Sequence, residues 1–167
     1  MDEVFVNPND VKLKRTVVFR GDQDQVRERI TRGANWILWI VGISVVNTVM
    51  ILFGSDSFFN LGLGATFIVD LLFKHVIQDS ENHARLILQG MNIGIDGVVY
   101  AIFLGLWHLT VRRFAKWGLI TAMILFTLDS LIFVGVGEWI PVAIHAVALF
   151  SMSGALIAFK DVEIKRL

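Results

Sequence analysis

Five apolar stretches dominate the chain, separated by short polar or glycine-containing segments. They cover residues 34–53, 58–77, 90–111, 117–136 and 139–159. A helix rises about 1.5 Å per residue, so roughly 20 apolar residues are needed to cross about 30 Å of bilayer hydrocarbon. The five tryptophans fall near the ends of these stretches, where aromatic rings prefer the lipid headgroup level. The pattern predicts an all-α integral membrane protein with a bundle of five apolar helices over residues 34–159.

Two basic segments flank the predicted bundle. Residues 1–33 form an arm that we expect on the cytoplasmic side, and residues 160–167 form a short tail. In the arm, VKLKRTVVF is suited to a strand, and Asp22 is placed to cap a brief helix over DQDQVRERITR. Because the first residues lack an apolar core, we expect no cleaved signal peptide. The cations of this helix are expected at anionic lipid headgroups; they are Arg27, Arg29 and Arg32.

The distribution of basic residues leaves two topologies open. The turns GSDS and GVGE carry no lysine or arginine, whereas both ends of the chain and residues 112–116 are basic. Because basic loops stay cytoplasmic, the charges favour four crossings, with either segment 58–77 or segment 90–111 re-entrant or interfacial. The number of apolar segments instead favours five crossings, which would put Arg112 and the C-terminus opposite the arm.

Composition narrows the classes of function. The chain is 55% hydrophobic, and its fifteen basic and fifteen acidic residues cancel, which disfavours binding to nucleic acid. Cysteine is absent, which excludes disulfides, thiolate metal sites and thiol catalysis. The metalloprotease, nucleotide-loop and dinucleotide motifs are also missing. We therefore predict a protein that is not an enzyme, has no cofactor or metal, and has the lipid bilayer as its main partner.

The stretch TLDSLIFVGVGEWIPVAIHAVALF carries an acid and an imidazole in otherwise apolar segments. Asp129 and His145 are equally far in sequence from Gly137, the centre of the turn between the two segments. In an antiparallel helical hairpin such residues lie at the same depth, so we expect them to meet. An isolated carboxylate at that depth costs about 2.5–3.5 kcal/mol. The pair is interpreted either as a hydrogen bond that closes the hairpin or as a group that binds a proton or cation.

Two more acids and a stripe of small residues lie in the second and third segments. Asp70 and Asp96 lie on either side of the polar loop 78–89 and are expected to reach interfacial water or to line a polar entrance. Small residues also follow one face of the third segment, where they would let another helix approach within the chain or across an oligomer. This packing stripe comprises Gly90, Gly94, Gly97, Ala101 and Gly105.

The first and last pairs of apolar segments share a pattern. Each pair runs from a tryptophan through an apolar helix to Asn47 or Asp129, and then to an acid in a glycine-containing turn. This suggests an internal two-helix repeat. The repeat would be inverted if a single spanning helix separates the two pairs, and parallel if the intervening segment does not span.

Three sequence stretches resemble a known pattern. GLGATFIVD, then TLDSLIF, then a GEW turn and IHAVALF resemble an uncharacterised family of small bacterial multi-pass membrane proteins with the pattern GLGxTQxxD, LDGLIF, W and HxxALF. The resemblance covers about residues 36–159, and this chain departs from the pattern at Phe67 and Ser130, where the family has glutamine and glycine. It implies bacterial origin and a location in the inner membrane, and it implies no catalytic activity.

Two functions are consistent with these features. The leading hypothesis is a protein that acts by helix–helix association, as a homo-oligomer or as an accessory subunit of a larger membrane complex. The alternative is a small transporter or channel coupled to protons or cations, in which Asp129 and His145 bind the ion and Asp70 and Asp96 line the entrance. The sequence predicts neither the partner nor the transported species.

Overall fold

The computed structural model describes residues 15–20, 22–53, 62–78 and 82–166. Within these residues five helices follow one another between two short strands. A 3₁₀ turn, η2 (Phe159–Asp161), connects the last helix to the second strand. Residues 1–14 and 21 of the predicted arm, the GSDS turn and the start of the second apolar segment lie outside the described residues. The elements are β1 (Arg15–Phe19), α1 (Gln23–Leu52), α2 (Gly64–Gln78), α3 (Asn82–Arg112), α4 (Lys116–Val136), α5 (Trp139–Ala158) and β2 (Val162–Arg166).

Four of the five helices are long and apolar enough to cross a membrane: α1, α3, α4 and α5. Helix α2 has 15 residues. At about 1.5 Å per residue it is roughly 22 Å long, which is short of a hydrocarbon core of about 30 Å. The predicted helical bundle and its five helices are thus confirmed, and α2 is the helix that falls short of a full span.

Helices α1 and α3 both extend beyond the apolar segments that predicted them. The brief arm helix is not separate, because α1 begins at Gln23 and continues without a break into the bundle. Asp22 caps it as predicted, since its Oδ1 accepts a hydrogen bond from the backbone N–H of Asp24 at 3.0 Å. The expected loop 78–89 is wrong from Asn82 onward, where α3 has already begun. Its first turns contain alanine, arginine, leucine and glutamine, which favour a helix even where hydropathy is low.

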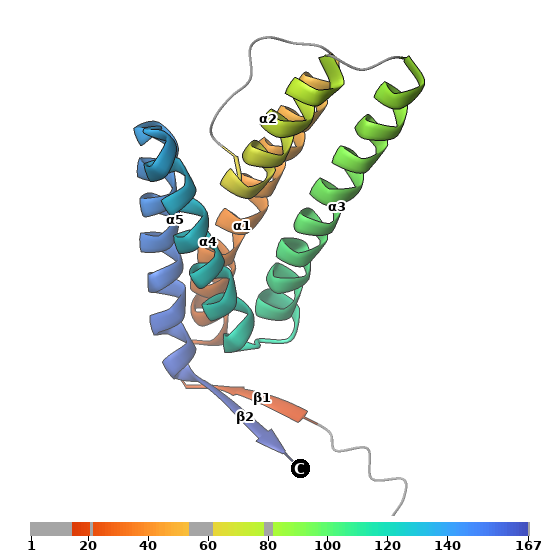
Figure 1. Cartoon of the computed structure of the whole chain (residues 1–167). Coiled ribbons are helices and arrows are strands. Elements are labelled where there is room, and N and C mark those ends of the chain that lie inside the picture. The colour runs from red at the N-terminus through yellow and green to blue at the C-terminus, as the bar shows by residue number, and fades with distance from the viewer. Residues whose placement is uncertain (1–14, 21, 54–61, 79–81, 167) are drawn as a thin grey trace, which may run out of the picture.

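Helices α4 and α5 run antiparallel to each other, whereas α1 and α2 run parallel. Helix α4 ends in a Schellman turn, in which Gly137 adopts a left-handed φ of 79° and Glu138 donates to the carbonyl of Phe133 at 2.9 Å. Helix α5 therefore folds back along α4. In contrast, Ser44 contacts Leu63 and Thr48 contacts Asp70, so residue numbers rise together along α1 and α2. In Figure 1 both helices rise toward the same end of the bundle. The packing thus does not reproduce the predicted two-helix repeat.

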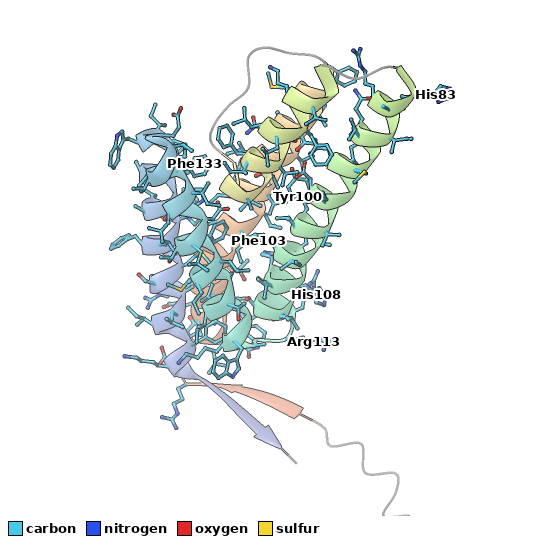
Figure 2. All side chains as sticks on the ribbon, viewed as in Figure 1. His83, Tyr100, Phe103, His108, Arg113 and Phe133 are labelled. Atoms are coloured by element: carbon cyan, nitrogen blue, oxygen red, sulfur yellow. The ribbon has the colours of Figure 1, made fainter. Side chains whose placement is uncertain are left out.

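The two ends of the described chain meet at one end of the bundle. Strand β1 pairs antiparallel with β2, from Arg15 opposite Arg166 to Phe19 opposite Val162. Figure 1 shows this sheet at the end of the bundle where α3 turns into α4. Figure 2 shows Arg113 at that end and His83 at the other. From the sequence we expected the arm and the tail to be separate segments, whereas the structure joins them in one sheet.

The bundle core lies where α1 packs between α5 and α3, with α4 beside α5. It is built from aliphatic and aromatic side chains that are almost fully buried; the largest are Ile30, Ile37, Ile40, Leu63, Leu119, Phe126, Phe133 and Met152. The outward faces of the long helices are also apolar, and Trp39 and Phe150 are 69% and 82% exposed. An apolar exterior of this kind is stable in lipid rather than in water.

Candidate functional site

Asp129 and His145 form a buried pair between α4 and α5. His145 Nε2 lies 3.0 Å from Asp129 Oδ2, and the two side chains are 5% exposed for the acid and 0% for the imidazole. The contact predicted from their equal distance to the Gly137 turn is therefore present in the structure. The rings of Phe126 and Phe133 pack against the imidazole, with centroids 5.7 and 5.6 Å away. The imidazole of the pair is thus packed against apolar rings.

Asp129 also caps the N-terminus of α2, which sequence reasoning did not predict. Its Oδ2 accepts a hydrogen bond from the Gly64 N–H at 2.7 Å, and its Oδ1 accepts one from the Ala65 N–H at 2.9 Å. The preceding N–H, of Leu63, donates to Ser44 Oγ at 2.6 Å. The first N–H groups of a helix have no partner within the helix, and its N-terminus carries a partial positive charge. A carboxylate accepts hydrogen bonds from these N–H groups and is attracted by the partial positive charge. Asp129 therefore allows α2 to begin inside the bundle.

The hydrogen bonds of His145 determine how many protons the pair holds. Its Nδ1 lies 2.9 Å from the carbonyl oxygen of Pro141, which can only accept, so Nδ1 carries a hydrogen. The 3.0 Å contact between Nε2 and Asp129 Oδ2 then needs a second proton between these atoms. This proton lies either on the imidazole or on the carboxyl group. In both cases the pair is neutral overall, as burial requires.

Glycines at the start of α2 allow it to approach its neighbours. A Cβ atom at Gly64 would lie 2.9 Å from the backbone oxygen of Asp129, and one at Gly62 would lie 2.4 Å from Ser44 Oγ. Asp129 and Ala65 also line a cavity of about 270 Å³ between α2, α3 and α4, whose other walls are apolar. We call Asp129, His145, the N-terminus of α2 and this cavity the Asp129 site.

A second polar cluster, the Thr48 cluster, lies between α1, α2 and α3. It consists of Thr48, Asp70, Asn92, Asp96 and Tyr100. Thr48 Oγ1 lies 3.2 Å from Asp70 Oδ2, 3.0 Å from Asp96 Oδ2 and 2.8 Å from the Tyr100 hydroxyl. Asn92 Nδ2 donates to Asp70 Oδ1 at 2.8 Å. The structure therefore brings the two predicted acids together.

The Thr48 cluster is not the polar entrance that the sequence predicted. Asp70 and Asp96 are 2% and 1% exposed, so neither carboxyl group is exposed at the protein surface. The reason is the direction of α2. Because this helix runs parallel to α1, Asp70 faces Thr48 in the interior.

The packing stripe of α3 faces outward. Gly90, Gly94, Gly97 and Gly105 would each accept a Cβ atom with nothing else within 4 Å, and Ala101 is exposed. The expected packing of this stripe against another helix of the same chain is therefore wrong for the described residues. An interface with another molecule stays a prediction.

The arm arginines are exposed, as headgroup binding would need. Arg32 forms a salt bridge with Glu28 one turn earlier, and the Arg27 guanidinium lies 5.7 Å from the centre of the Phe114 ring. Arg29 has no such contact among the described residues. Contact of all three with lipid headgroups stays a prediction.

Sequence reasoning missed four polar members of these two sites: Ser44, Thr48, Asn92 and Tyr100. A signal for two of them was present, because Asn92, Asp96 and Tyr100 recur at intervals of four residues and so share one face of a helix. The glycine stripe occupies a different face of α3 and is the more conspicuous of the two patterns. Ser44 and Thr48 gave no comparable signal, since isolated hydroxyl groups are common in membrane helices.

Comparison of the chain with protein-family models, curated proteins and solved structures gave no match. What the structure adds to the resemblance is spatial: GLG, LDS and IHA, from the three quoted stretches, meet at the Asp129 site. Within the described part of the chain, no group of three or more histidine, aspartate or glutamate side chains is placed to hold a metal ion. The fold and sites define a helical bundle with an apolar exterior and two polar sites in its interior.

Proposed function

We propose that this chain is a membrane transporter or channel for protons or cations, in which the Asp129–His145 pair takes up and releases a proton. The observation that carries the proposal is the Asp129 site, a buried acid–imidazole pair that shares one proton between Nε2 and Oδ2 and whose acid lines a cavity. Histidine is the side chain whose charge changes most readily near neutral pH. Ionisable groups inside membrane bundles usually serve ion or proton pathways, because burying them is otherwise costly.

The position of α2 supports this proposal. Its N-terminus lies inside the bundle against α4, while its C-terminal end lies at the end of the bundle where α3 begins. Transporters commonly use such discontinuous helices, whose N-termini point at a binding site near the middle of the membrane. A purely structural hydrogen bond between α4 and α5 would not require a third helix to begin at the same carboxylate.

The proposal includes a membrane topology. Helices α1, α3, α4 and α5 would cross the bilayer, and α2 would enter and leave on one side. Both chain ends and Arg113 would then lie on the same side, since β1 pairs with β2 near the turn from α3 to α4. By the positive-inside rule this is the cytoplasmic side. With the bacterial origin that the resemblance implies, the membrane is the inner membrane.

Cysteine labelling tests this topology directly, because the natural chain has no cysteine. In right-side-out vesicles, a membrane-impermeant maleimide is expected to label Glu138→Cys and His83→Cys, and to leave Arg113→Cys and Leu167→Cys unlabelled until the vesicles are lysed. Labelling of Arg113→Cys and Leu167→Cys from opposite sides would show an odd number of crossings between them and contradict the topology.

Ion flux tests the function itself. Reconstituted in liposomes with an imposed pH or cation gradient, the wild-type protein is expected to dissipate the gradient, as reported by a pyranine dye. Asp129→Asn removes the ionisable carboxyl group, and His145→Gln removes the imidazole, so both are expected to reduce flux to that of empty liposomes. Thr127→Val changes an exposed residue of the same helix and serves as the control. Each variant is reconstituted from its monodisperse fraction, and wild-type liposomes that hold the gradient would reject the proposal.

Association through α3 is the second candidate function. The observation that favours it is the outward-facing packing stripe, at which a partner helix could approach the backbone of α3 closely. The partner would be a second copy of this chain or another subunit of a membrane complex. This function and transport are compatible, because the stripe and the Asp129 site use different surfaces.

A further inference from the structure

Two oxygen atoms of the Thr48 cluster have no hydrogen-bond partner among the residues that the structure describes. They are Asn92 Oδ1 and Asp96 Oδ1, and both side chains are 1% exposed. Buried polar atoms are nearly always satisfied, so two orphans in one cluster call for an explanation. Asn92 and Asp96 are four residues apart on α3 and therefore neighbours on one face of the helix. The two unsatisfied oxygens thus come from neighbouring positions on one face of α3.

The orientation of the Asn92 amide is determined by the hydrogen bond of its NH₂ group. Its Nδ2 donates to Asp70 Oδ1 at 2.8 Å, so the amide oxygen is the end left without a partner. An amide oxygen only accepts hydrogen bonds or binds cations. The second orphan is a carboxylate oxygen with the same preference. A ligand that satisfies both must therefore be a hydrogen-bond donor or a cation.

The hydrogen-bond count around Thr48 gives the net charge of the cluster. Thr48 Oγ1 has three oxygen neighbours, the Tyr100 hydroxyl and one carboxylate oxygen each from Asp70 and Asp96. Each of these contacts needs a proton between the two oxygens. Thr48 and Tyr100 supply one proton each, so the third belongs to a carboxyl group. One carboxylate charge remains, which a single positive charge would balance.

The chemistry of the cluster selects the kind of cation. All of its candidate ligand atoms are carboxylate, amide or hydroxyl oxygens, with no imidazole or sulfur. Oxygen ligands bind hard cations and do not favour zinc, copper or iron. A cavity of about 180 Å³, lined by Thr48, Asp96, Gly97 and Tyr100 among others, adjoins the cluster and gives a small ion room to enter.

We propose that the Thr48 cluster binds one small hard monovalent cation, of the class of Na⁺ and Li⁺. Asn92 Oδ1 and Asp96 Oδ1 are its first ligands, and the second carboxylate, from Asp70, adds negative charge beside it. The proposal rests on the proposed transport function, in which this cation would be the transported or coupling ion. The sites are separate, since the Asp129 site lies between α2, α4 and α5 and the Thr48 cluster between α1, α2 and α3.

Equilibrium binding of radioactive ²²Na⁺ to the purified full-length protein in detergent tests this inference. Saturable binding is expected for the wild type, with competition by Li⁺ and none by choline at the same ionic strength. Asp96→Asn removes a ligand charge and is expected to abolish saturable binding. Thr48→Val is expected to weaken it at least tenfold, whereas Thr48→Ser keeps the hydroxyl group and should restore it. Thr127→Val, the matched exposed substitution, should bind as the wild type does.

The outcomes separate this inference from the proposed function. No saturable ²²Na⁺ binding by the wild type, or unchanged binding by Asp96→Asn, overturns the cation site even if liposomes show proton flux. Binding that depends on Asp96 and Thr48 supports the site even if liposomes show no flux, in which case the transport function alone fails. Thr48→Ser covers the case in which Asp96→Asn does not fold, because binding by the serine variant and not by the valine variant identifies the hydroxyl group.

Discussion

Replacing Asp129 by alanine is expected to lower the free energy of unfolding by about 3–5 kcal/mol. The carboxylate is the hydrogen-bond partner of two backbone N–H groups of α2 and of the His145 ring. Alanine leaves all three groups buried without a partner. It also removes the oxygen acceptors that the N-terminus of α2 faces, so α2 should detach from α4 before the long helices separate.

The measurement is thermal unfolding of the detergent-solubilised protein, followed by tryptophan fluorescence. Asp22→Ala is the matched control, because Asp22 also caps a helix but is exposed, and loss of such a cap costs about 1 kcal/mol. The Tm shift of Asp129→Asn should fall between those of Asp129→Ala and Asp22→Ala. The amide of the asparagine keeps one oxygen that accepts a hydrogen bond, but its NH₂ group replaces the other oxygen and faces another donor. Equal shifts in Tm for Asp129→Ala and Asp22→Ala would contradict the role of Asp129 as a buried cap.

Hydropathy predicted the boundaries of α4 and α5 well, because they follow local composition, whereas α1 and α3 begin before their apolar segments. The predicted segments 117–136 and 139–159 match α4 and α5 to within a residue. The boundaries of the second helix were harder to predict, because the start of α2 depends on Asp129, which is distant in sequence. No local pattern shows that a helix begins inside a bundle where a remote carboxylate caps it. The charge distribution favoured four crossings, and α2 is the helix that falls short of the length of a full span.

The candidate sites show the same limit. The Asp129–His145 contact was predictable because it depends only on one tight turn at Gly137 and on helix rise. The Thr48 cluster depends on α2 running parallel to α1, which the sequence pattern did not predict. Asp70 and Asp96 were expected at an entrance because they lie on either side of the loop 78–89, near the ends of their segments. The outward face of the glycine stripe was also unpredictable, because small residues indicate a close approach without identifying the partner.

Replacing Gly33 by leucine is the second substitution with a large expected effect. Even a Cβ atom at Gly33 would lie 2.5 Å from Ala155 Cβ and 2.9 Å from the backbone oxygen of Ser151, so α1 and α5 must separate to accommodate a side chain. Overpacking of this kind costs about 1–3 kcal/mol, and leucine should reach or exceed the upper end. In the smaller variant Gly33→Ala, adding Ala155→Gly should recover part of the loss, because it removes the nearest atom.

Gly94→Leu is the matched control on the outward stripe, where a Cβ atom would meet nothing within 4 Å. Its Tm in detergent is expected to equal that of the wild type, whereas Gly33→Leu should unfold at a clearly lower temperature. Similar losses of Tm in both variants would mean that leucine destabilises these helices wherever it replaces glycine, and not through the α1–α5 contact. The same two proteins test association, because the side chain introduced by Gly94→Leu would displace a partner helix from the stripe. The detergent-corrected mass of Gly94→Leu should then fall to that of one chain, and an unchanged mass would leave the packing stripe without a partner of its own kind.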